Sequence, residues 1–150
     1  MGRLANKNIL ITGGNSGIGL AAAQEVDREG ARVAICGLNE GWLQAAKETL
    51  GAGSLAVRAD VSNLTDLDTM FATIKREFGH LDGVGVNADY SEFLFVEEVT
   101  EQSVDKVMAV NFNRLSSVTR TTSGRSARLV RDDVQGWPSV ASRRWCTNIE

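Results

Sequence analysis

The sequence predicts an α/β protein with a doubly wound parallel sheet, meaning that helices cover both of its faces. Up to residue 112, short apolar runs of strand length alternate with longer segments of helical periodicity. The apolar runs are continuous rather than alternating with polar residues, which is typical of strands buried on both faces. Because crossovers between parallel strands are right-handed, four such strands would take the order 3-2-1-4.

The elements follow one another with short links. Strands are expected at residues 7–12, 32–36, 55–59 and 81–86. Helices are expected at residues 17–29, 40–50 and 64–78, and a last helix follows a Thr100 cap and runs to about Asn111. Ser62 or Asn63 can cap the third helix. In this order the carboxyl ends of the first and fourth strands are neighbours, and open α/β sheets bind their ligands at such a switch point.

Apolar spacing predicts which face of a helix is buried. In the first and third helices, apolar residues recur at intervals of three or four, as the buried face of an amphipathic helix requires. The residues that define these faces are Ile18, Ala22 and Val26 in the first helix and Leu67, Phe71 and Ile74 in the third.

A glycine-rich turn follows the first strand and leads directly into the first helix. Residues 12–19 read Thr-Gly-Gly-Asn-Ser-Gly-Ile-Gly. Glycines let the backbone turn tightly and approach a phosphate closely, and a fresh helix N-terminus offers unpaired N–H groups and a positive dipole end. Glycines also occur in ordinary turns, but the strand before and the helix after favour a nucleotide site.

The spacing Thr-Gly-x-x-x-Gly-x-Gly resembles the cofactor loop of the short-chain dehydrogenase/reductase family, whose fold is Rossmann-like. Three further motifs follow in the family's order within residues 4–112. Asp60 stands at the end of the third strand, Val86-Asn87-Ala88-Asp89 stands where the family has Asn-Asn-Ala-Gly, and Asn111 lies in the last helix. The resemblance implies that Asp60 binds the adenine ring, although an acid there can also cap the next helix.

Site residues are carried over from the family position by position. The resemblance makes Asn111 the proton-relay asparagine of the catalytic group, whereas a lone helical Asn is more often a surface or cap residue. The implied cofactor-binding residues are Thr12, Gly13, Asn15, Ser16, Gly17, Ile18, Gly19, Leu38, Asp60, Val61, Asn87 and Ala88.

The end of the second strand bears on the choice between NADP and NAD. Enzymes of the family that use NAD place an acid there, and this chain has Gly37. Enzymes that use NADP usually place Arg at the next position, which here is Leu38. The missing acid favours NADP without excluding NAD. Asp89 replaces the family's glycine and brings a negative charge near the phosphate path, which disfavours binding by Coulomb repulsion.

The family's catalytic pair is Tyr-x-x-x-Lys on a helix after a fifth strand, together with a Ser. Residues at i and i+4 share a helix face, so the ammonium can lower the tyrosine pKa for general acid or base catalysis. The only tyrosine here is Tyr90, the last lysine is Lys106, and no Tyr-x-x-x-Lys occurs among the 150 residues. We therefore expect a chain that keeps the cofactor half-site and has little or no turnover.

Composition changes abruptly near residue 112. Residues 1–112 hold 9 Lys and Arg and 16 Asp and Glu, a net charge of −7, whereas residues 113–150 hold 7 Arg and 3 acids, a net charge of +4. The second part is rich in Arg, Ser and Thr and poor in large apolar residues, so it is predicted to be a mostly disordered tail. Residues 1–112 then form an incomplete dinucleotide-binding domain truncated to four strands.

Other classes of function are disfavoured. Interspersed Ser and Thr in the tail argue against a nucleic-acid patch, and no apolar run has transmembrane length. No metal site is expected, because His80 is the only histidine and falls in a turn. Cys36 falls in a strand as a core residue, and Cys36 and Cys146 make no disulfide framework, so a cytoplasmic protein is expected.

These observations predict an NAD(P)-dependent oxidoreductase of the short-chain type, present as a truncated chain. A small-molecule substrate is expected only for a full-length relative, and the substrate and oligomeric state stay open. Two alternatives remain: a non-catalytic NAD(P)-binding or regulatory module, and a non-functional product of a shifted reading frame. The second would leave the fourth strand as an unpaired apolar edge, which is prone to aggregation.

Overall fold

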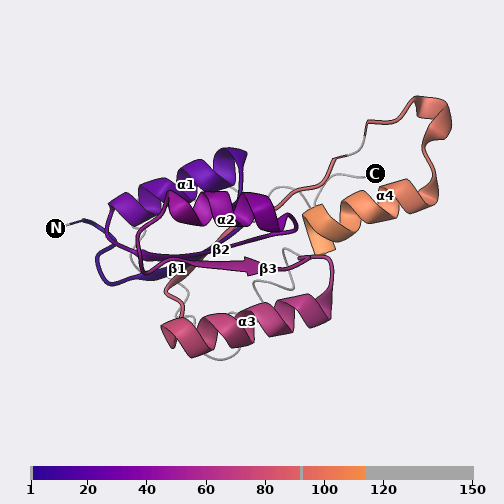
Figure 1. Cartoon of the computed structure of the whole chain (residues 1–150). Helices are drawn as coiled ribbons and strands as arrows, with labels where there is room; N and C mark the ends of the chain where they lie inside the picture. Colours follow the sequence, from indigo (N-terminus) through magenta and orange to yellow (C-terminus); the bar gives the residue numbers. More distant parts are fainter. Residues whose placement is uncertain (1, 92, 114–150) are drawn as a thin grey trace, which may run out of the picture.

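A computed structural model describes residues 2–91 and 93–113 and confirms the α/β fold (Figure 1). One parallel sheet has the predicted order β3-β2-β1-β4. Its strands are β1 (Asn8–Thr12), β2 (Arg32–Gly37), β3 (Leu55–Arg58) and β4 (Gly83–Val86). The α-helices are α1 (Gly17–Arg28), α2 (Glu40–Glu48), α3 (Leu64–Phe78) and α4 (Glu101–Met108). Two short elements complete the described part, the 3-10 turn η1 (Val96–Glu98) and the π-helical turn η2 (Ala109–Asn113).

Successive residues of the two central strands face opposite layers, so both faces of the sheet are buried. Leu10 of β1 is paired with Ala34 of β2 and Val84 of β4, and it belongs to the core beneath α3. Ile11, the next residue, belongs to the core beneath α1 and α2. In Figure 1, α1 and α2 accordingly lie on one side of the sheet and α3 on the other. This arrangement explains why the central strands read as continuous apolar runs.

The buried face of α1 differs from the predicted one. Ile18 is 82% exposed and Ala22 is also exposed, whereas Gly19 and Ala23 are buried and Val26 packs at the edge of the core. The reason is the close approach of Gly19 to the glycine turn, since a Cβ at Gly19 would lie 2.2 Å from the carbonyl oxygen of Gly13. Gly19 must therefore face the turn, and its neighbour Ile18 then faces outward.

The predicted face of α3 is correct in its main residues. Leu67 and Ile74 are buried, Phe71 packs partly against the same cluster, and Met70 and Phe78 complete it. The helix begins at Asn63, whose side-chain oxygen accepts the N–H groups of Thr65 and Asp66. α3 thereby closes the lower face of the sheet.

Burial ends before the last strand. Among residues 82–91 and 93–111 no residue is buried, and α4 has no buried residue. Thr100 caps α4 as predicted, accepting the N–H of Ser103. The predicted boundary at residue 112 falls within η2, and the tail prediction for residues 113–150 concerns a segment that, from residue 114 on, lies outside the described residues. No helix in the described part is long and apolar enough to span a bilayer.

Candidate nucleotide-binding site

The glycine turn between β1 and α1 adopts a backbone that only glycine takes easily. Gly13 and Gly17 have φ angles of 65° and 53°, in the left-handed region. A Cβ at Gly13 would lie 2.9 Å from the Cα of Ala88, so the turn packs directly on the chain that follows β4. A Cβ at Gly17, by contrast, would meet nothing within 4 Å. The turn is therefore closed toward the sheet and open at the N-terminus of α1.

A single hydroxyl joins the carboxyl ends of β1 and β4. Thr12 is fully buried, and its Oγ1 accepts the backbone N–H groups of Asn87 at 3.0 Å and of Ala88 at 3.1 Å. The Asn87 side chain donates in turn to the carbonyl oxygen of Gly13 at 3.4 Å. The two strand ends that the topology makes neighbours are thus bonded to each other through side chains.

The N-terminus of α1 differs from those of the other three α-helices. Side chains of Asn39, Asn63 and Thr100 cap α2, α3 and α4, and each of these helices has an acid in its first turn. Ser16 at the start of α1 makes no side-chain cap, and the first turn of α1 holds no acid. The positive end of the α1 dipole is therefore left uncompensated by the protein, which suits a bound anion.

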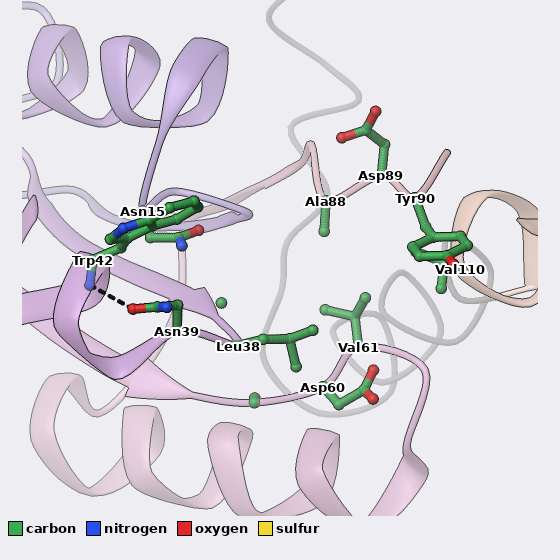
Figure 2. Close-up of a pocket in the computed structure, with 12 residues that line it drawn as sticks. Asn15, Leu38, Asn39, Trp42, Asp60, Val61, Ala88, Asp89, Tyr90 and Val110 are labelled. Carbon is green, nitrogen blue, oxygen red and sulfur yellow. Dashed lines mark hydrogen bonds between the residues drawn. The ribbon is translucent and has the colours of Figure 1, made fainter. Parts of the chain in front are cut away.

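A cavity of about 230 Å³ lies beside this turn, at the carboxyl ends of the strands. Figure 2 shows its walls: Asn15, Asn39 and Trp42 on one side, Leu38, Asp60 and Val61 below, and Ala88, Tyr90 and Val110 opposite. Gly37, Ala59 and Asp89 complete the lining. Segments from the glycine turn, from β2, from the chain after β3 and from the chain after β4 thus meet around one volume.

Five of the predicted cofactor residues line this cavity: Asn15, Leu38, Asp60, Val61 and Ala88. The remaining seven lie outside the lining, in the glycine turn, at the start of α1 and after β4. They are Thr12, Gly13, Ser16, Gly17, Ile18, Gly19 and Asn87. Sequence reasoning missed the lining roles of Asn39, Trp42, Ala59, Tyr90 and Val110. Trp42 lies in the first turn of α2 and is 60% exposed, a property that the sequence alone does not reveal.

Asp60 lines the cavity and also bonds the turn before α3. Its Oδ1 accepts the N–H of Ser62 at 2.7 Å. Its own N–H donates to the carboxylate of Asp66 at 2.9 Å. The helix cap itself is Asn63, so Asp60 fixes the turn before α3 and does not cap the helix.

Asn111 fastens the opposite wall. Its Oδ1 accepts the N–H of Tyr90 at 2.8 Å, and its Nδ2 donates to the carbonyl oxygen of Tyr90 at 2.9 Å. The Lys106 ammonium lies 4.4 Å from the centroid of the Tyr90 ring, within cation–π distance. Tyr90 is thus held at its backbone by Asn111 and at its ring by Lys106, and η2 is connected to the cavity.

Charged and nucleophilic groups near the cavity are few. Cys36 is fully buried in β2, as predicted for a core residue, and burial raises the pKa of its thiol to about 11, so the thiol stays protonated. The exposed carboxylate of Asp89 points away from Leu38 and Val61 (Figure 2). Within residues 2–91 and 93–113, no three His, Cys, Asp or Glu side chains are grouped as metal ligands.

Comparison with known proteins bears on what this site binds. The sequence model of the family described as short chain dehydrogenase matches residues 7–127. The chain is 40% identical over 109 residues to the oxidoreductase asL5 of Sarocladium schorii, covering 73% of this chain and 44% of that protein. It is 36% identical over 112 residues to 2-(S)-hydroxypropyl-CoM dehydrogenase 3 of Xanthobacter autotrophicus, covering 73% and 44%. It is 34% identical over 109 residues to galactitol 2-dehydrogenase of Agrobacterium fabrum, covering 73% and 43%. The chain thus spans less than half the length of these relatives.

Proposed function

The chain belongs to the short-chain dehydrogenase family, and from that premise we propose that it binds an NAD(P) dinucleotide across the α1 N-terminus and the adjoining cavity. The observation that carries the proposal is the uncapped, acid-free start of α1, beside a Gly17 with open space above it. The pyrophosphate fits this helix end, and the adenosine fits the cavity lined by Leu38, Asp60 and Val61.

Each proposed contact follows from the chemistry of the residue. The backbone N–H groups of Ser16, Gly17 and Ile18 are suited to donate to phosphate oxygens. The carboxylate of Asp60 accepts a hydrogen bond from the adenine amino group, while Leu38 and Val61 pack on the ring. When bound, the dinucleotide supplies hydride transfer. The absence of an acid at Gly37 favours NADP over NAD.

We further propose that these 150 residues by themselves are the cofactor half of a short-chain oxidoreductase and have little or no turnover. They contain no Tyr-x-x-x-Lys, so Asn111 lacks the partners with which it would relay a proton. Removing a general acid typically lowers a rate by ~10²–10⁴. A cytoplasmic location belongs to the same proposal and is supported by the buried free thiol of Cys36.

The test compares two glycines that both have a positive φ, Gly17 at 53° and Gly79 at 80°. Gly17→Ala and Gly79→Ala both place a methyl group at positive φ with nothing within 4 Å, but Gly79 ends α3, away from the cavity. Both variants should lose about 1 kcal/mol of unfolding free energy. Fluorescence titration with NADPH should show micromolar binding for the unchanged chain and for Gly79→Ala, and at least tenfold weaker binding for Gly17→Ala. Equal affinities for the two variants, or no binding by the unchanged chain, would refute the proposed site.

A second measurement addresses turnover and the origin of the chain. The transcript should be sequenced across codons 112 to 127, because the family match extends to residue 127. A Ser followed by Tyr-x-x-x-Lys in another reading frame would support truncation by a frameshift. Absence of the motif from every frame would favour the alternative of a non-catalytic NAD(P)-binding module. Measurable oxidation of NADPH or NADH by the purified chain would contradict the proposed lack of turnover.

A further inference from the structure

Asn15 and Gly37 are in direct contact across the cavity rim. A Cβ built on Gly37 would lie 2.5 Å from Oδ1, 2.7 Å from Cγ and 3.1 Å from Nδ2 of Asn15. The Asn15 carboxamide therefore packs against Gly37 at the end of β2, and both residues line the cavity. Gly37 does not have a positive φ, so its backbone would accept any residue. The three atoms nearest to a Cβ at position 37 all belong to the Asn15 side chain, so this side chain is the first obstacle to a larger residue there.

This contact matters because of where it lies. In dinucleotide-binding folds, an acid about 20 residues after the glycine turn accepts the ribose 2′-hydroxyl of NAD. Here the space into which such an acid would project is filled by an amide. An amide carries no negative charge and has two N–H donors, so it suits a 2′-phosphate, which a carboxylate would repel.

We propose that Asn15 is the residue that sets cofactor specificity in this chain, because its carboxamide takes the place of the acid that selects NAD. This inference rests on the proposed cofactor site and extends it to a coupled pair. In Gly37→Asp alone, the new side chain must displace the Asn15 carboxamide before it can reach the ribose, so this variant should make a poor NAD site. Removing the carboxamide at the same time gives the acid room to reach the ribose.

The experiment is a double-mutant cycle read as binding. NADH and NADPH are titrated by their fluorescence against the unchanged chain, Asn15→Ala, Gly37→Asp and the double variant, and Asn15→Ala with Gly37→Ala supplies the uncharged control. The unchanged chain should bind NADPH at least tenfold more tightly than NADH. Gly37→Asp should weaken both cofactors at least tenfold, and the double variant should bind NADH at least tenfold more tightly than Gly37→Asp does.

Thermal unfolding of the same proteins provides a readout that needs no cofactor. Gly37→Ala should lower the midpoint through crowding against Asn15, and Asn15→Ala should remove that loss in the double variant. Additive effects on binding, with NADPH or NADH still bound by the unchanged chain, would overturn the role of Asn15 and leave the proposed function standing. If the unchanged chain bound neither cofactor, the proposed function would fail together with this inference.

Discussion

The two walls of the cavity belong to regions that are packed very differently. Asn15, Trp42 and Asp60 come from the part of the chain before Leu81, where α3 alone buries four side chains in the core. Tyr90 and Val110 come from residues 82–113, of which none up to residue 111 is described as buried, and α4 leaves apolar side chains exposed. One wall is therefore held by hydrophobic packing and the other by a few polar contacts. The two walls should respond to different substitutions.

The largest contrast is expected between two leucines. Leu67 of α3 is 2% exposed and Leu94, before η1, is 38% exposed. Leu67→Ala should cost about 3 kcal/mol of unfolding free energy, because the cavity left in a packed core cannot fully collapse. Leu94→Ala should cost less than about 1 kcal/mol. Urea denaturation of both variants measures the difference, and equal costs would show that residues 82–113 are packed as tightly as the rest.

The next effect tests the hydroxyl that fastens the second region to the first. Thr12→Val keeps the buried shape of the side chain but leaves the N–H groups of Asn87 and Ala88 without their acceptor. Two such donors should cost about 2 kcal/mol together. Thr69→Val is the matched control. Thr69 is exposed and its hydroxyl donates to the carbonyl oxygen of Thr65 within α3, so the variant should lose only about 0.5 kcal/mol of unfolding free energy. Similar midpoints for the two variants in urea would mean that Thr12 does not join the walls.

The same contrast explains what the sequence could predict. Strands and helices of the first region were predictable because continuous apolar runs and helical spacing are imposed by burial on both faces of a sheet. The switch point could be located because topology makes β1 and β4 neighbours. The face of α1 was predicted wrongly because spacing takes no account of the contact between Gly19 and Gly13, which decides the rotation of the helix.

The second wall was harder to predict for a physical reason. Tyr90 and Val110 are 20 positions apart and share one wall, where Asn111 bonds the backbone of Tyr90 and Lys106 lies over its ring. No local pattern encodes such a long-range polar contact. Asn15 was predicted as a cofactor residue, but its packing on Gly37 depends on how the glycine turn crosses the end of β2. Its role in specificity could therefore be argued only from coordinates.

A smaller effect is expected where Asn111 holds that wall. Asn111→Ala removes two hydrogen bonds to the Tyr90 backbone at an exposed position and should cost about 1 kcal/mol locally. Amide hydrogen exchange at Tyr90 should accelerate roughly fivefold, while exchange in α3 stays unchanged. Asn111→Asp keeps the acceptor for the Tyr90 N–H, so its exchange rate at Tyr90 should lie between those of the unchanged chain and of Asn111→Ala. Gln102 is exposed in the preceding helix, so Gln102→Ala should leave the exchange rate of the Tyr90 amide unchanged. If Gln102→Ala accelerated that exchange as much as Asn111→Ala does, the Asn111 hydrogen bonds would not be what holds Tyr90.

The smallest effect concerns the opposite end of β4, where Asp82 fastens the second region to the start of β1. Its carboxylate accepts the N–H of Asn8 at 2.8 Å and the Lys7 ammonium at 3.2 Å, and His80 lies 3.3 Å away. Partial burial raises the pKa of Asp82, but the Asn8 N–H and the Lys7 charge outweigh it, so the pKa is lowered overall. The folded state therefore holds the Asp82 proton less tightly than the unfolded state does.

It follows that the Asp82 carboxylate contributes to the unfolding free energy fully at pH values above the pKa of an unfolded aspartate, about 4. This contribution is lost as the pH falls through the lower pKa of the folded state. The unfolding free energy of Asp82→Asn should lie below that of the unchanged chain at pH 6 and should approach it toward pH 3. Thr12→Val carries no titrating group, so its deficit should stay constant over the same range. If the two deficits ran parallel with pH, the Asp82 carboxylate would not be the group that holds this end of β4.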